Sequence, residues 1–240
     1  MLGLGKRKFE GAAAALALVA SLGTAATARA AIVVSSSGPS AAKYPVGTKV
    51  EDSERITLQA GDSVTVIEKQ GTRELKGPGR FRVDGPTATA KNTTFAIFSQ
   101  SRQSSRAIVG GTRLGEGARL SPNLWYVDLD RPGNYCLSDP DEITFWRADE
   151  KAPARYTLAG AGTAQTLTFA KGASMIATDT PIATGAEYTV YRDGEDAPVG
   201  TAKFVVLEDA PQEAEGLADM LIANGCMAQL KAMSNALAVR

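Results

Sequence analysis

Histidine is absent from this chain of 240 residues. Its absence excludes the Ser-His-Asp and Cys-His pairs that activate nucleophiles in many hydrolases, and it excludes histidine-containing zinc sites. Chemistry that needs carboxylates alone, as in many glycosidases, passes this filter because it requires only two Asp or Glu residues that face one bond. Nothing in the sequence places such a pair, so a carboxylate-based hydrolase is a weak hypothesis.

Long hydrophobic runs are scarce as well, and the one that stands out lies near the N-terminus. Basic residues 6–8 precede an Ala/Leu-rich run over residues 11–28, and an Ala-Arg-Ala pattern at its end suits signal peptidase. We therefore expect residues 1–30 to be a signal peptide that is cleaved between Ala30 and Ala31. This predicts a periplasmic or secreted protein.

The alternative interpretation of this run is an uncleaved membrane anchor. The run consists mostly of alanine and is interrupted by Gly23 and Thr24, whereas a bilayer span needs roughly 20 apolar residues. We therefore expect no stable membrane span in the mature chain. No cysteine sits at the end of the run, so the thioether anchor of a bacterial lipoprotein is not available.

Cysteine is limited to Cys136 and Cys226. In an exported chain we expect these two residues to form a structural disulfide. In the chain-entropy model, closing a loop of roughly 90 residues contributes about 4 kcal/mol of stability. The alternative, two free thiols or a redox pair, is disfavoured because no Cys-x-x-Cys spacing is present to lower a thiol pKa.

An excess of positive charge is also missing. Residues 1–30 hold four of the 26 basic and one of the 26 acidic residues, so 22 basic and 25 acidic residues remain in the mature chain, a net charge of about −3. This balance argues against general nucleic-acid binding, which needs a clear basic excess.

Residues 31–83 show short alternating segments broken by Gly and Pro, which predicts a small antiparallel β-domain. We expect turns at Gly61-Asp62, Gln70-Gly71 and Gly77–Gly79. The expected core residues are Ile56, Leu58, Val64, Val66, Ile67, Leu75, Phe81 and Val83.

The stretch YPVGTKVEDSERITLQAGDSVTVIEKQGTRELKGPGRFRV resembles the periplasmic β-domain of the FecR family. It shares the order of an early Gly, an apolar strand ending in Ala-Gly-Asp, a Val-rich strand, a Gly turn and a Gly-Pro-Gly before an aromatic residue. Where many relatives carry Asp-Gly-Ser at the central turn, this chain has Gln70-Gly71-Thr72. About ten residues precede the apolar run, so the cytoplasmic anti-sigma segment of FecR is not expected. The resemblance implies a stand-alone envelope module.

Residues 84–120 form a connector rich in Thr, Ser, Gly and Arg, and residues 121–209 show eight strand-like segments separated by turns. This spacing predicts an immunoglobulin-like β-sandwich with Tyr135 and Trp146 in or near its core. The likeness is architectural, because Tyr135 is adjacent to Cys136 and the Tyr-x-Cys corner is absent. The segments are residues 125–129, 135–137, 143–148, 155–158, 166–169, 174–177, 187–191 and 201–207.

Residues 210–240 change to a helical period, with Pro211 expected in the first turn. Asn224-Gly225 is expected to divide this region into two helices. The second helix carries Cys226, Leu230, Met233 and Leu237 on one apolar face. A disulfide to Cys136 then attaches that face to the sandwich. The predicted fold is therefore mainly β, with a C-terminal helical tail.

Two motifs resemble functional sites, but neither is interpreted as one. Ser40-Ala41-Ala42-Lys43 matches Ser-x-x-Lys of penicillin-recognising enzymes, but a helix is not expected after Gly38-Pro39 and the partner motifs are missing. Asp128 and Asp130, with the acids at positions 139, 141 and 142, suggest calcium ligands. Pro132 in the fifth loop position breaks the EF-hand pattern, so we interpret these residues as solvated loop acids.

Charge is segregated along the chain. Residues 69–119 hold ten basic and three acidic residues, a local net charge of +7, whereas residues 120–240 hold 9 basic and 17 acidic residues, a net of −8. Such asymmetry steers an anionic partner to one end of a molecule. Arg102, Arg106 and Arg113 are the predicted partner-binding residues. The alternatives are that the two halves face each other or that the charges are solvated.

The leading hypothesis is a non-enzymatic exported adaptor that binds another envelope protein through a signalling or scaffold module, with no cofactor. The second is a carbohydrate-binding or peptidoglycan-binding module. Such sites stack exposed aromatic residues on sugars, and this chain offers Trp125, Trp146 and six tyrosines. The supply is small, so this hypothesis ranks lower.

Overall fold

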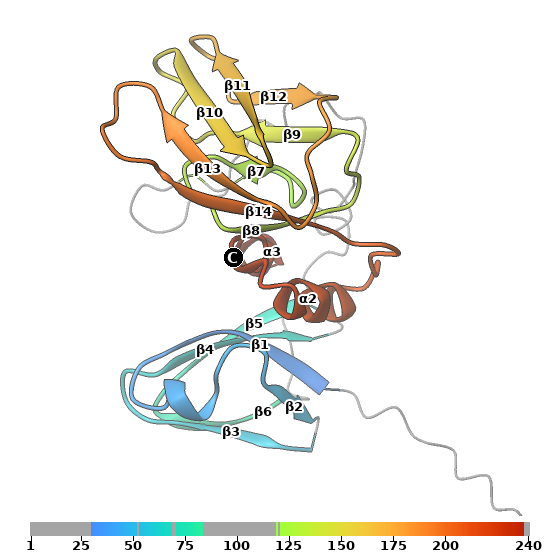
Figure 1. Ribbon diagram of the computed structural model, residues 1–240. Coiled ribbons are helices and arrows are strands. Elements are labelled where there is room, and N and C mark those ends of the chain that lie inside the picture. Colours follow the sequence, from blue (N-terminus) through green and yellow to red (C-terminus); the bar gives the residue numbers. More distant parts are fainter. Residues whose placement is uncertain (1–29, 52, 69–70, 84–118, 120, 238–240) are drawn as a thin grey trace, which may run out of the picture.

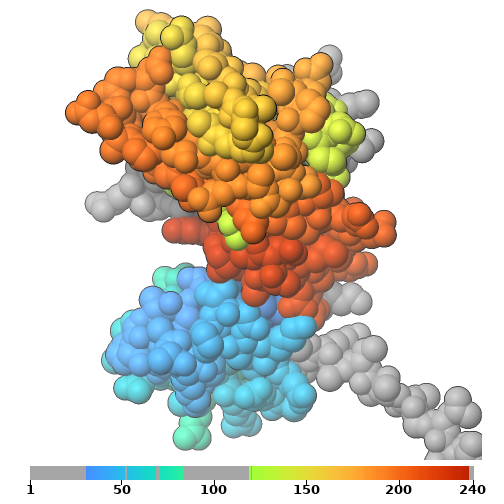
Figure 2. All heavy atoms as spheres, viewed as in Figure 1, coloured from blue at the N-terminus to red at the C-terminus, as the bar shows by residue number. Residues whose placement is uncertain are grey.

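The computed structural model describes residues 30–51, 53–68, 71–83, 119 and 121–237 (Figure 1). This part of the chain is mainly β and has two helices towards its C-terminal end, as the sequence predicted. We call residues 30–83 the N-lobe and residues 121–209 the C-lobe. Figure 2 shows the helical residues, in red, filling the space between the blue N-lobe and the orange C-lobe.

The N-lobe contains two antiparallel sheets. The larger sheet has the strand order β2-β1-β4-β5, and the smaller one pairs β3 with β6. A short 3-10 helix, η1 (Ala41–Lys43), follows Ser40, so the Ser-x-x-Lys serine does not lie on an α-helix. The strands are β1 (Ala30–Ser37), β2 (Lys49–Glu51), β3 (Arg55–Leu58), β4 (Ser63–Glu68), β5 (Gly71–Lys76) and β6 (Gly79–Arg82).

The predicted N-lobe core is confirmed: its aliphatic members are buried and Phe81 packs against them half-buried. The turn at Gly61 is present, and Gly61 adopts a φ of 84°, which favours glycine. Gly71 is already the first residue of β5 and pairs with Glu68, while Gln70 of the predicted turn lies outside the described residues.

Strand β1 is apolar on both faces because both faces are covered. Ala31 and Val33 belong to the core inside the N-lobe. Ile32 and Val34 belong instead to the core formed with the helices. The alternation of side chains along a strand therefore places neighbouring residues of β1 in two different cores.

The C-lobe contains a five-stranded sheet of order β11-β10-β13-β14-β8 and a three-stranded sheet of order β12-β9-β7. The pairs β14–β8 and β7–β9 are parallel. Each predicted strand segment contains a strand, and Tyr135 and Trp146 are buried as predicted. The strands are β7 (Val127–Asp128), β8 (Asn134–Leu137), β9 (Ile143–Trp146), β10 (Ala154–Gly160), β11 (Thr163–Phe169), β12 (Met175–Thr178), β13 (Glu187–Arg192) and β14 (Gly200–Val206).

One side chain deep in the C-lobe was not anticipated. Arg147 is 1% exposed, and its guanidinium donates hydrogen bonds to the carbonyls of Ala152, Ala170 and Ala173 at 2.8–3.0 Å. It also lies 5.0 Å from the centre of the Phe169 ring. Arg147 therefore joins the segments around residues 152 and 170–173 through charge-assisted hydrogen bonds.

The helices are α2 (Ala214–Ala223) and α3 (Met227–Leu237). Pro211 lies before α2 rather than in its first turn, so that expectation is wrong: Glu213 is the N-cap. The predicted break at Asn224-Gly225 is confirmed. Gly225 has a φ of 68°, its N–H donates to Ile222, and the Cys226 N–H donates to Leu221, which is the Schellman arrangement.

Cys226 directly precedes α3, and its carbonyl accepts the Leu230 N–H. The predicted Cys136–Cys226 disulfide is present. Around it, Ile32 and Ile67 of the N-lobe, Leu124 and Leu207 of the C-lobe side, and the inner faces of both helices form one continuous apolar core. The helices are therefore a shared middle layer, not a tail attached to the C-lobe alone.

Candidate functional site

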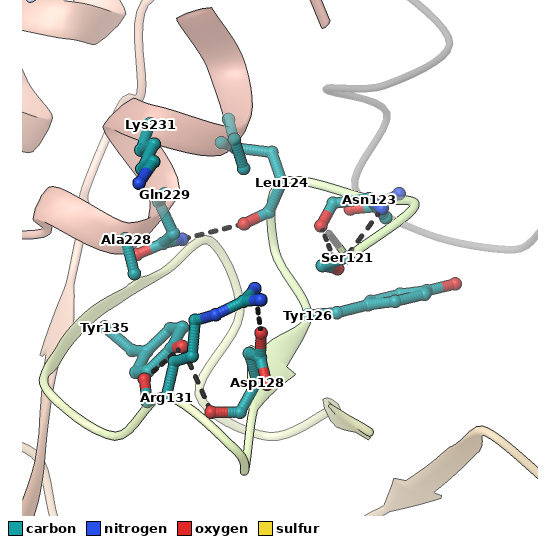
Figure 3. A pocket seen from close by; sticks show the side chains of 11 residues that line it. Ser121, Asn123, Leu124, Tyr126, Asp128, Arg131, Tyr135, Ala228, Gln229 and Lys231 are labelled. Atoms are coloured by element: carbon teal, nitrogen blue, oxygen red, sulfur yellow. Dashed lines mark hydrogen bonds and ion pairs between the residues drawn. The ribbon is translucent and has the colours of Figure 1, made fainter. Parts of the chain in front are cut away.

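A pocket of about 220 Å³ lies where the segment before β8 meets α3 (Figure 3). In Figure 3, Ala228 and Lys231 of α3 lie on one side of the pocket, and Ser121, Asn123 and Tyr126 lie on the other. The lining residues are Ser121, Asn123, Leu124, Tyr126, Asp128, Arg131, Tyr135, Ala228, Gln229, Lys231 and Ala232.

The turn between β7 and β8 sets the polar side of the pocket. Oδ1 of Asp128 accepts the Asp130 N–H at 3.0 Å, and Oδ2 forms an ion pair with Nη1 of Arg131 at 3.1 Å. The Tyr135 hydroxyl donates to the carbonyls of Arg131 and Asp128, at 2.9 and 3.2 Å. These contacts hold the Asp128–Arg131 pair against the pocket wall.

Asp128 is only 5% exposed, so its interpretation as a solvated loop acid is wrong. Burial raises the pKa of its carboxyl to about 6, although the Arg131 charge and the Asp130 N–H oppose this effect. Asp130 is not free in solvent either, because it accepts hydrogen bonds from Ala148 N–H and the Tyr156 hydroxyl. Both carboxylates are therefore held by hydrogen bonds to other groups of the protein.

Gln229 forms the floor of the pocket towards the disulfide. Its amide accepts the Cys136 N–H and donates to the carbonyls of Cys136 and Leu124, at 2.6–2.9 Å. Strand β8 lies at the edge of its sheet. A side chain from α3 thereby takes the place of a neighbouring strand at that edge.

Two cations line the pocket with unused donors. Nη1 of Arg131 contacts Asp128 and the Arg119 carbonyl. Its other nitrogens, and the ammonium of exposed Lys231, have no acceptor or ion-pair partner within the part of the chain that the structure describes. Since Asp128 balances one of the two charges, the pocket carries a net charge of about +1.

A second polar surface lies on the smaller sheet of the N-lobe, which we call the basic face (Arg55, Arg80 and Arg82). The alternation of β3 and β6 exposes these side chains, while Ile56 and Leu58 point into the core. Arg55 is directly opposite Arg82, so two like charges face each other across the strand pair.

The predicted partner-binding residues Arg102, Arg106 and Arg113 lie outside the described residues, as does most of the predicted connector. Several nearby basic residues are paired within the molecule: Arg73 contacts Glu68, Lys76 contacts Glu74, and Arg119 contacts Glu150 of the C-lobe. Ala30 and Ala31, which flank the predicted cleavage site, are the first residues of β1.

The pocket was not predicted from the sequence, although the position of one polar residue indicated it. Gln229 is a polar residue three positions after Cys226, on the apolar face that predicted the second helix. A buried polar side chain in such a position needs hydrogen-bond partners, which here are the backbone groups of Cys136 and Leu124. Lys231 carries no comparable signal.

No protein-family model, no curated protein and no solved structure matches this chain. Among the described residues, no helix is long and apolar enough to cross a bilayer. The same part of the chain holds no group of three or more Cys, Asp or Glu residues placed to bind a metal ion.

Proposed function

We propose that this protein is a non-enzymatic exported envelope protein that acts as a protein-binding adaptor or scaffold. In this proposal residues 31–83 form a FecR-like module and residues 121–209 an immunoglobulin-like sandwich. The single observation that carries the binding role is the basic face. Its partner is an acidic surface of another envelope protein.

The basic face favours binding because it exposes cationic side chains together on one sheet. Arg55 lies opposite Arg82 on the antiparallel pair, and Arg80 lies on the same exposed face. Within the described chain, neither Arg55 nor Arg80 forms an ion pair. Carboxylates of a partner gain charge-assisted hydrogen bonds from these two guanidinium groups.

The shared middle layer supports a scaffold role. Residues of both lobes and both helices contribute to one apolar core, and the Cys136–Cys226 disulfide lies within it. A partner that binds the N-lobe is therefore held at a fixed position relative to the C-lobe. The disulfide also supports export, because such bonds persist in oxidising compartments.

The test is crosslinking and pull-down from intact envelopes that express the protein. The variant Arg55→Glu/Arg80→Glu reverses two exposed charges of the basic face, and Lys151→Glu/Lys171→Glu makes the same charge change on exposed positions of the C-lobe. We expect the first variant to lose its crosslinked protein partner and the second to retain it. Equal recovery of the partner with both variants would overturn the proposal.

A further inference from the structure

We infer that the pocket between the β7–β8 turn and α3 binds a small monocyclic carboxylate. This inference is independent of the adaptor function, because the pocket and the basic face have no residue in common. The ligand's carboxylate pairs with Lys231 and with the unused edge of the Arg131 guanidinium. Its ring packs on the apolar wall.

The volume of the pocket limits the size of the ligand. The pocket volume is about 220 Å³. An engineered protein cavity of roughly 150 Å³ accommodates benzene, and one water molecule occupies about 30 Å³ in the liquid. A single ring with a short polar substituent therefore fits, whereas an oligosaccharide or a peptide of several residues does not.

The apolar wall is built from both sides of the pocket. Leu124 and Ala232 are buried members of the shared core, and Ala228 packs against the C-lobe core. The half-buried Tyr126 lies on the side of the pocket opposite Ala228, next to Ser121 and Asn123 in Figure 3. The side chains of Ala228 and Ala232 on α3 are small and leave space in the pocket, so the ring of the ligand lies against them.

Charge decides the class of polar group. Asp128 repels an anion, but its oxygens already accept hydrogen bonds from Arg131 and the Asp130 N–H. Gln229 and Tyr135 are likewise committed to backbone partners. Among the charged groups that line the pocket, the uncommitted ones are the Lys231 ammonium and the outer nitrogens of Arg131, and both are donors. A carboxylate supplies the acceptors that these cations need.

The experiment is a titration of the full oxidised protein with benzoate, followed by NMR chemical-shift changes, with benzamide as the neutral probe of the same shape. We expect saturable benzoate binding with shift changes confined to residues around the pocket. Benzamide binds more weakly, by up to about fivefold for each ion pair that it does not form, since one partly exposed ion pair contributes up to about 1 kcal/mol.

Two lysine variants and one control complete the test. We expect Lys231→Gln to weaken benzoate binding about fivefold with little effect on benzamide, and Lys231→Arg to restore it. Lys171→Gln removes an exposed charge elsewhere on the C-lobe and leaves binding unchanged. The spectra report whether each variant is folded. Equal affinity for benzoate and benzamide, or wild-type affinity in Lys231→Gln, would overturn the inference, as would the absence of saturable binding.

Discussion

Each lobe buries one aspartate at a turn, and the two carboxyls respond in opposite directions. Asp62 of the N-lobe is 3% exposed and Asp128 of the C-lobe is 5% exposed. Burial raises the pKa of Asp62, but hydrogen bonds from Ser40 and the Gln59 N–H outweigh it and hold the pKa below its usual value. For Asp128, burial prevails despite its ion pair. The degree of burial alone therefore does not decide the protonation state.

The difference follows from the number and kind of donors. Both oxygens of Asp62 accept backbone N–H groups that are fixed by the turn and by η1. Asp128 receives one backbone N–H and one guanidinium, and the Arg131 side chain remains 37% exposed. A carboxylate is best stabilised by donors that are themselves held in place.

The largest expected effect concerns the disulfide, which joins the C-lobe to the helices of the shared middle layer. We expect the double variant Cys136→Ser/Cys226→Ser to lose about 4 kcal/mol of unfolding free energy, because the disulfide closes a long loop. The α2–α3 region should then become sensitive to limited proteolysis. The measurement is denaturant unfolding of both proteins. Equal midpoints would contradict a stabilising role for the disulfide.

The next effect concerns the C-lobe alone. Arg147→Ala leaves the carbonyls of Ala152, Ala170 and Ala173 without their donor and creates a cavity beside Phe169, so we expect a loss of about 3 kcal/mol. The control Arg155→Ala removes an exposed ion pair with Asp193 and should change stability by less than about 1 kcal/mol. Similar losses of unfolding free energy in both variants would show that the buried hydrogen bonds of Arg147 stabilise the fold no more than an exposed ion pair does.

Asp128 gives an effect of similar size that depends on pH. Its pKa of about 6 exceeds the usual unfolded value of about 3.9, so the folded protein binds the proton more tightly. The stability from this group is complete below about pH 4 and is lost as pH rises through 6, on the order of 3 kcal/mol. Asp128→Asn should flatten this part of the stability profile.

The measurement is thermal or denaturant unfolding at several values between pH 4 and 7. Asp141→Asn is the matched control because Asp141 is exposed. It should keep the wild-type slope. If Asp128→Asn keeps the wild-type dependence of stability on pH, another group causes that dependence. The contrast between Asp128 and Asp62 would then not hold.

Asp62 gives the smallest and opposite effect. Its lowered pKa means that it stabilises the fold above its unfolded pKa, and this stability is lost as pH falls through the folded pKa. Asp62→Asn should therefore reduce stability at neutral pH and make it less sensitive to acid. Glu54→Gln, at an exposed N-lobe position, is the control. Parallel acid profiles for wild type and Asp62→Asn would contradict the assignment.

The sequence predicted the N-lobe well because its physics is local. Alternation in segments such as residues 63–67 reports directly which side chains are buried, and Gly61 marks a turn that few other residues tolerate. The strands of the C-lobe and the break at Gly225 were predicted for the same reason. The two cysteines left one intramolecular pairing, and it is present.

What the sequence did not reveal depends on contacts between distant segments. In the sequence Arg147 resembles any arginine at the end of a strand, and only the fold brings the carbonyls of Ala152, Ala170 and Ala173 to it. Asp128 resembles a solvated acid for the same reason. The helices were expected to cover the C-lobe alone, because nothing in their own period shows that Ile32 and Ile67 pack on the opposite face. The pocket arises from that assembly and has no local pattern.

The position of β1 has a consequence for biosynthesis. Ile32 and Val34, on the first described strand, are covered by α2 and α3, the last described helices. During synthesis α2 and α3 leave the ribosome after β1, so these two side chains stay uncovered until residues 214–237 have emerged. The final packing of the strand therefore waits for a segment that is made about 180 residues later.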